Sequence, residues 1–179
     1  MDFALRPMLL ETPRLTLSPT GPLDRDFFFA LQSDPSVMAF VANNRTEAMI
    51  EDKFQQACLP WDKTAPQWLS LVVREKASNS PIGLHGFRCN WAHRQAELGF
   101  LFAPAFQGQG YAKEATLAII ALARDLGFHK LAAVVTSGNT PSAGLLEKCG
   151  FEREGVLKEH FLLNGRWHDD WHYGLLLGQ

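Results

Sequence analysis

The chain has 179 residues, of which 46% are hydrophobic and 20% are charged. This length and composition fit about one globular domain with a full core, and they argue against a disordered chain. The formal net charge of −2 excludes the strong positive field with which whole proteins attract nucleic acid or anionic membranes. We therefore expect a single domain over residues 1–179 and neither nucleic acid nor a membrane as partner.

The cysteines and the N-terminal residues indicate in which cellular compartment the protein is expected. The chain has three cysteines, Cys58, Cys89 and Cys149, and no C-x-x-C pair. Because the number is odd and no such pair occurs, a disulfide framework is not expected. Residues 1–10 lack the apolar core of a signal peptide. No apolar run reaches the about 18 residues of a membrane span. These features predict a reducing compartment, the cytoplasm.

The first part of the chain predicts one strand, two helices and then three strands. Residues 14–17 alternate as a strand does. Pro22 is typical of a helix start, and a second helix is expected from near Thr46 to just before Pro60. The three strands that follow are predicted at about 67–74, 82–89 and 95–102.

A long helix is predicted from near Gln109, because one apolar face repeats over several turns until Gly127, a good C-terminal stop. The short apolar segment 131–135 is typical of a buried parallel strand. Residues 101–136 therefore predict a strand–helix–strand crossover.

The last part predicts a short helix and a hairpin. Thr140 and Pro141 are expected as N-cap and first residue of a helix that ends at Gly150. Asn164-Gly165 is the strongest short turn signal, and predicts a hairpin over about 152–177. The mixed order of strands and helices favours an α/β or α+β sheet covered by helices.

The segment Gln107-Gly108-Gln109-Gly110-Tyr111-Ala112 lies between a predicted strand and the long helix. Glycines permit positive φ and close approach of a ligand, and free N–H groups at a helix start favour phosphate. A glycine-rich turn that only starts the helix is the alternative. Lys113 excludes a GxGxxG dinucleotide fingerprint, and no Walker GxxxxGK[ST] motif is present.

This segment resembles the Q/R-x-x-G-x-G/A acetyl-CoA signature of the GNAT acetyltransferases. Two further segments agree with that family: Ala96–Phe100, and the Ser137–Ser142 stretch continuing to Leu146-Glu147-Lys148-Cys149-Gly150-Phe151. The opening 11–15 and the ending 163–169 are similar to the branch that acetylates ribosomal-protein N-termini.

The resemblance implies a GNAT fold, with a central mixed, mostly antiparallel sheet of about seven strands flanked by about four helices. It implies acetyl-CoA as cosubstrate and no metal. Leu101 and Phe102 would pair through their backbones with the pantetheine arm, where the fourth and fifth predicted strands splay. Asn139 would hydrogen-bond the pantetheine or fix the following helix. The pyrophosphate would be held by the loop, Gln107, Gly108, Gln109, Gly110, Tyr111 and Ala112.

Acetyl transfer by direct attack in a ternary complex requires a proton acceptor for the amine. Glu97 is the first candidate, because a strand places it on one face with Gly99 and Leu101. A solvated surface charge is the alternative. His85 is the second candidate, with a core histidine as alternative. His168, Asp170 and His172 would share a strand face, but a metal site is not expected from them.

The proton donor departs from the common pattern. Many GNAT enzymes have a tyrosine before E-K-x-G-F, whereas this chain has Leu146. Ser142 is therefore the candidate that hydrogen-bonds the leaving thiol, unless it only satisfies the helix start. The missing tyrosine also leaves open an acyl-CoA-binding sensor or interaction module without turnover.

The acceptor is expected to be an amine, either a small molecule or a protein N-terminus, and a homodimer is one expected assembly. Aromatic side chains offer walls for an apolar or cationic acceptor. They are Trp61, Trp68, Phe87, Trp91 and Trp167.

Overall fold

The computed structural model describes residues 8–178, which contain one eight-stranded sheet in the order β1-β2-β3-β4-β5-β6-β8-β7. Neighbouring strands are antiparallel except β5 and β6. The strands are β1 (Leu10–Glu11), β2 (Leu15–Pro19), β3 (Leu69–Glu75), β4 (Pro81–Asn90), β5 (Gln95–Phe102), β6 (Lys130–Thr136), β7 (Glu152–Leu163) and β8 (Arg166–Leu176).

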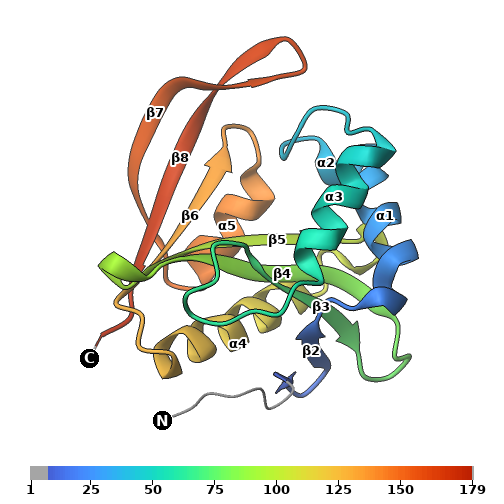
Figure 1. Ribbon diagram of the computed structural model, residues 1–179. Coiled ribbons are helices and arrows are strands. Elements are labelled where there is room, and N and C mark those ends of the chain that lie inside the picture. The colour runs from blue at the N-terminus through green and yellow to red at the C-terminus, as the bar shows by residue number, and fades with distance from the viewer. Residues whose placement is uncertain (1–7, 179) are drawn as a thin grey trace.

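Helices cover the two faces of the sheet (Figure 1). They are α1 (Arg25–Ser33), α2 (Pro35–Met38), α3 (Glu47–Ala57), α4 (Tyr111–Asp125) and α5 (Thr140–Lys148). On one face, α4 and α5 bury apolar side chains such as Ile119 and Leu146 in the larger core cluster. On the other, α1 and α3 bury Phe28, Ile50 and Phe54 over Val72 and Leu84. None of the helices in residues 8–178 combines the length and apolarity needed to cross a membrane.

The mostly antiparallel sheet and the β5–α4–β6 crossover confirm the predicted fold class. The sheet has one strand more than expected, because the two-residue β1 pairs with β2. The four-residue α2 is the additional helix. Both elements are too short to give a periodic pattern, so their formation depends on tertiary contacts.

The start of α5 corrects one prediction. Thr140 is the first helical residue, and the N-cap is Asn139, whose side chain accepts a hydrogen bond from the Ser142 N–H at 3.4 Å. Asparagine and threonine both cap helices well, so sequence preference did not separate the two adjacent positions.

The predicted hairpin is confirmed. Asn164 and Gly165 have φ values of 49° and 76°, the left-handed pair that a two-residue primed turn requires. The register of β7 against β8 shifts between Leu157 and Phe161, where Glu159 has a φ of 45°. This irregularity bends β7 and turns His160 toward Asp170 of β8.

Candidate functional site

The sheet opens between its two parallel strands. β5 pairs with β4 along its whole length, Gln95–Phe102 against Asn90–Gly83. It pairs with β6 only through Gln95–Glu97 against Lys130–Ala132. After Glu97 the two strands diverge, as the predicted splay requires, and the edge of β5 is left without a partner strand.

The unpaired edge of β5 presents main-chain groups to this gap. The Ala103 N–H donates to the Ile82 carbonyl at 2.9 Å. Because ladder bonds alternate, odd-numbered residues of β5 bond β4, while Phe100 and Phe102 direct their N–H and C=O into the gap. Of the two residues predicted to bind pantetheine through their backbones, Phe102 therefore directs its main-chain groups into the gap. The main-chain groups of Leu101 bond to β4 instead. The Phe102 carbonyl accepts a hydrogen bond from Gln107 Nε2 at 2.8 Å.

The glycine-rich loop lies between β5 and the start of α4. Gly108 and Gly110 have φ values of 72° and 83°, which glycine adopts without strain. Within residues 8–178, the N–H groups from Gly108 to Ala112 have no acceptor. Five such donors at a helix start form a site for an anion such as pyrophosphate.

The turn between β1 and β2 anchors this loop. Arg14 donates to the Gln109 carbonyl at 3.0 Å and to Glu114 at 2.7 Å, and its guanidinium lies 4.3 Å from the centre of the Tyr111 ring. Thr12 Oγ1 also donates to Glu114, at 2.6 Å. These contacts hold the first turn of α4 against β2.

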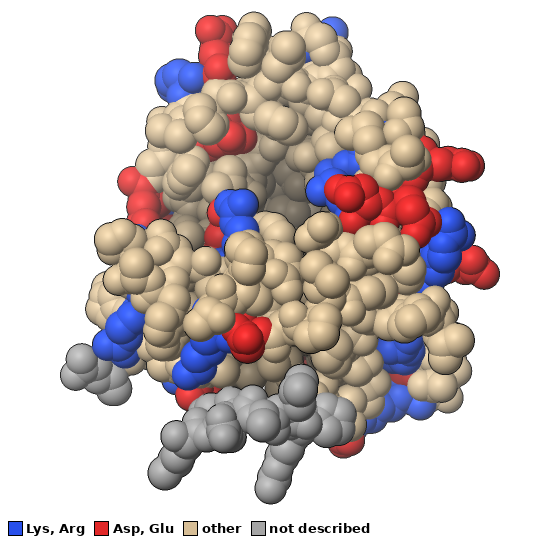
Figure 2. Space-filling model, in the orientation of Figure 1, with Lys and Arg blue, Asp and Glu red and all other residues tan. Residues whose placement is uncertain are grey.

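A cleft of about 640 Å³ opens at this gap, because residues of both splayed strands line it, Leu98–Leu101 of β5 and Ala133–Thr136 of β6. It is the hollow in Figure 2, between the α1–α3 helices and the β7–β8 hairpin. Its floor is formed by Gly86 and Gly99, with Trp68 beside them. A Cβ atom on Gly99 would lie 2.9 Å from the Trp68 ring, so glycine at this position lets the indole lie against the strand. A cleft of this size holds a small molecule or the end of a peptide.

Residues 14–152 match the family model described as acetyltransferase (GNAT) domain. The chain belongs to the GNAT acetyltransferase family. The family match supports acetyl transfer by this chain, and the splayed strands, the loop and the cleft form its candidate site.

Relatives of the chain agree with this family. YoaA, an uncharacterised N-acetyltransferase of Bacillus subtilis, is 30% identical over 167 residues, or 90% of this chain and 92% of the relative. The [ribosomal protein uS5]-alanine N-acetyltransferase of Escherichia coli is 37% identical over 73 residues, which is 40% of this chain and 38% of that protein.

A solved structure gives the same result. The spermidine N-acetyltransferase of Vibrio cholerae in complex with CoA and spermine superposes with a TM-score of 0.80 at 27% identity. The match covers 93% of this chain and 97% of that one. All three relatives are named as acetyltransferases, which supports acetyl transfer and gives no support to a binding module without turnover.

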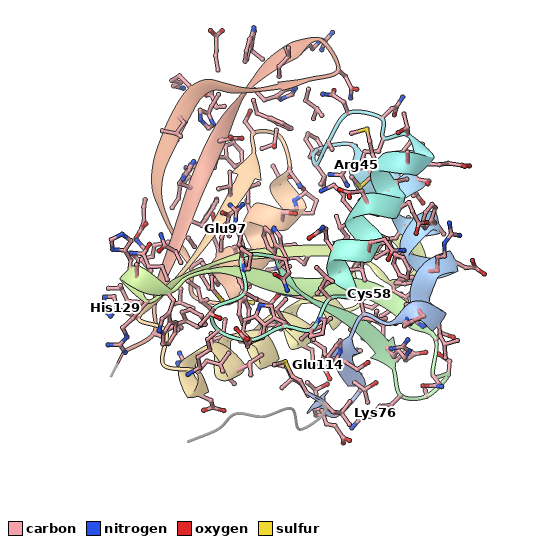
Figure 3. The ribbon with its side chains drawn as sticks, in the orientation of Figure 1. Arg45, Cys58, Lys76, Glu97, Glu114 and His129 are labelled. Atoms are coloured by element: carbon pink, nitrogen blue, oxygen red, sulfur yellow. The ribbon has the colours of Figure 1, made fainter. Side chains whose placement is uncertain are left out.

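The two predicted catalytic residues of this GNAT enzyme lie in different surroundings. Ser142, in the first turn of α5, lines the cleft together with Asn139. Glu97 shares a face with Gly99 and Leu101, as predicted, but lies outside the cleft lining and forms an ion pair with Arg88 at 3.0 Å. Figure 3 shows Glu97 on β5, at the side of the cleft away from α3.

His85 lies on the α4 face of the sheet beside its cross-strand partner Phe100, and it is also among the residues that line the cleft. Its Nε2 contacts Thr116 Oγ1 at 2.9 Å, and that hydroxyl donates to the Ala112 carbonyl at 2.8 Å. His85 Nε2 is thus the donor, and Nδ1 has no partner within residues 8–178. Burial lowers the pKa of His85 to about 3, so this GNAT enzyme holds it as a neutral, weakly basic side chain at neutral pH.

The tail strand contributes a residue pair that the sequence did not reveal. His168, Asp170 and His172 share a face, as the alternation predicted. Asp170 lines the cleft, is 7% exposed, and accepts a hydrogen bond from His160 Nδ1 at 2.7 Å. His160 reaches Asp170 because of the β7 irregularity, which has no signature in the sequence. Across residues 8–178, no three His, Cys, Asp or Glu side chains are placed to hold a metal ion.

Of the five aromatic residues considered as cleft walls, Trp68 lines the cleft. Trp61 and Trp91 instead pack against the core rings of Phe87 and Phe128, and Trp167 is 59% exposed on the hairpin. The aromatic walls come from phenylalanines whose tertiary position the sequence did not indicate, Phe28, Phe40, Phe100 and Phe161.

The neutral state of His85 predicts a specific acid sensitivity. The unfolded chain takes up a proton at this histidine near its usual pKa of 6.5, whereas the folded chain does so only near 3. Stability therefore falls as the pH drops below about 6.5, by about 2 kcal/mol at pH 5. In His85→Gln, which keeps a hydrogen-bonding side chain, this part of the loss is expected to be absent. Denaturant unfolding at pH 8 and pH 5 measures the difference, and equal losses in both proteins would contradict it.

Proposed function

We propose that this chain transfers the acetyl group of acetyl-CoA to a primary amine, by direct attack within a ternary complex. The observation that carries the proposal is the gap after Glu97, which has the anion-binding loop on one side and the cleft on the other. A thioester in this gap would face an amine in the cleft without an enzyme-bound intermediate.

The residues around the gap fit acetyl-CoA. The N–H groups of Gly108, Gln109, Gly110, Tyr111 and Ala112 would donate to the pyrophosphate, with Gln107 positioning the loop through its bond to Phe102. The outward main-chain groups of Phe102, and of Phe100 beside it, would pair with the pantetheine amides as an added strand does. The side-chain oxygen of Asn139 caps α5, and its amide N–H₂ remains for the pantetheine.

The reaction requires an attacking amine, an N–H group for the oxyanion, a proton acceptor and a hydrogen-bond donor to the leaving sulfur. The amine nitrogen attacks the thioester carbonyl carbon, and a main-chain N–H of β5 that faces the gap, at Phe102 or Phe100, would stabilise the oxyanion. Glu97 would take the amine proton, directly or through water. The C–S bond then breaks, its electron pair goes to sulfur, and a proton converts the thiolate to the CoA thiol. Ser142 would hydrogen-bond the sulfur as that charge develops.

No step of this proposal needs a metal ion, because main-chain N–H groups and side chains supply the charge stabilisation. The amine is a small molecule or a protein N-terminus, and the relatives named for spermidine and for ribosomal protein uS5 support both classes. A cytoplasmic location and a homodimer stay predictions; the three cysteines are free thiols.

The loop assignment predicts the effect of a β-branched side chain. Gly110→Val places a Cβ where φ is 83°, which disturbs the N–H groups proposed to hold pyrophosphate, and should abolish acetyl-CoA binding measured by titration calorimetry. Gly165→Val is the matched control, because Gly165 has a φ of 76° and open surroundings at the hairpin tip. A folded Gly110→Val protein with wild-type affinity would disprove the assignment.

The role of Glu97 is tested by Glu97→Gln, which keeps the shape of the side chain and removes its basicity. We expect kcat to fall roughly 10- to 10⁴-fold. Arg88→Gln, which removes the ion-pair partner but leaves the carboxylate, should keep most of the activity. If Glu97→Gln retains wild-type kcat while Asp170→Asn does not, the base is Asp170 and Glu97 only pairs with Arg88.

The role of Ser142 separates turnover from binding. Ser142→Ala should lower kcat and kcat/KM together, by about 10- to 100-fold for one hydrogen bond to developing charge, with CoA affinity unchanged. Thr140→Ala is a control at the exposed start of the same helix. A lower melting temperature of Ser142→Ala with intact kcat would assign this serine to helix stability alone.

A further inference from the structure

Opposite walls of the cleft carry charges of opposite sign. Arg45, Asp52 and Lys53 lie along the wall formed by α3 and the segment before it. Asp170, held by His160, lies on the wall formed by the β7–β8 hairpin. Figure 2 shows basic and acidic groups at the rim of the hollow, and Figure 3 places Arg45 beside α3 at the cleft.

Arg45 is a half-buried cation whose charge is not balanced by a carboxylate. Its guanidinium donates to the amide oxygen of Gln32, and no ion pair of Arg45 occurs among residues 8–178. A guanidinium stays charged in proteins even though burial lowers the pKa of Arg45. A partly desolvated charge without a counter-ion is costly, so this position favours an anionic group brought by a ligand.

Lys53 adds to the same field. Its pKa is lowered first by burial and second by the charge of Arg45, while Asp52 raises it. No carboxylate of the described chain forms an ion pair with Lys53. Two cations and one carboxylate leave this wall with one net positive charge.

The wall formed by the β7–β8 hairpin favours a positively charged ligand group. Asp170 is almost fully buried, and His160 supplies one hydrogen bond to a carboxylate that has room for several. Ser142 lines the same cleft, close to where the proposed reaction puts the thioester. An ammonium group is therefore attracted toward Asp170, and an anion toward Arg45.

We infer that the acetyl acceptor is a primary amine that also bears a carboxylate, bound with its amine toward Asp170 and its carboxylate toward Arg45 and Lys53. This inference rests on the proposed function and names the substrate class of that site. A planar carboxylate matches the paired donors of a guanidinium. A polyamine, such as the spermidine of the Vibrio cholerae relative, would place a second cation against Arg45.

The inference is tested with matched pairs of amines and detection of the released CoA thiol. Each ω-amino acid from glycine to aminohexanoate is compared with the alkylamine that lacks its carboxylate, and L-phenylalanine with phenethylamine. Spermidine is included. At least one carboxylate-bearing amine should have a kcat/KM roughly 10- to 100-fold above its partner. A panel in which no carboxylate-bearing amine exceeds its partner overturns the inference.

Substitutions at Arg45 test whether this residue causes the preference for carboxylate-bearing amines. Arg45→Gln should remove most of the preference by lowering kcat/KM for the carboxylate-bearing amine and leaving the alkylamine nearly unchanged. Arg45→Glu should shift the preference toward diamines. Lys76→Gln is the charge-matched control, at the far end of the molecule from the cleft (Figure 3), and should keep the wild-type preference. An unchanged preference in Arg45→Gln also overturns the inference.

Acetyl-CoA affinity, measured separately by calorimetry on the same proteins, distinguishes the two levels of failure. Acetyl-CoA binding with turnover of alkylamines or spermidine, but no carboxylate preference, rejects the zwitterionic acceptor and leaves the proposed function standing. Absence of acetyl-CoA binding rejects the proposed function itself.

Discussion

The short pairing between β5 and β6 is the constraint on which the rest of the site depends. Three residue pairs join these strands before they separate. An unpaired strand edge inside a sheet has hydrogen-bonding groups that must find another partner, either water or a ligand with amides. Because the crossover through α4 starts at this edge, the same local geometry puts the free N–H groups of a helix start at the end of the gap. One topological feature thus creates both halves of the proposed cosubstrate site.

The two faces of the sheet also have different environments. Side chains of β4 and β5 alternate between α4 on one face and the cleft on the other. The His85 side chain is on the α4 face, where burial keeps it neutral, whereas Leu84, the residue before it, packs with the helices of the opposite face. A shift of one residue in strand register would exchange these roles, since it turns every side chain to the opposite face. The bond from His85 to Thr116 therefore ties α4 to the register that forms the cleft.

Periodicity and turn signals predicted most of the fold, since long amphipathic helices and alternating strands carry their pattern in the sequence. The hairpin turn at Asn164-Gly165 and the helix behind the glycine-rich loop are examples. The two shortest elements, β1 and α2, were not predicted because two to four residues have no period.

The site was predictable where function depends on local backbone, and not where it depends on tertiary placement. The loop from Gly108 to Ala112 was visible because positive φ demands glycine. The phase of the β5 ladder, which favours Phe100 over Leu101 as a main-chain partner, follows from a register that no single strand encodes. Arg45 and His160 come from a loop and a strand irregularity, and only the folded chain brings them to the cleft.

The anchoring of the glycine-rich loop by Arg14 and Thr12 has a consequence for how this protein can diverge. Those contacts join the loop to β2 and α4, whereas the cleft walls belong to α1–α3 and to the β7–β8 hairpin. Substitutions on the walls therefore leave the contacts that shape the loop intact. Under the proposed function, exchange of a few wall residues changes the acceptor, while the contacts that shape the proposed acetyl-CoA loop stay the same.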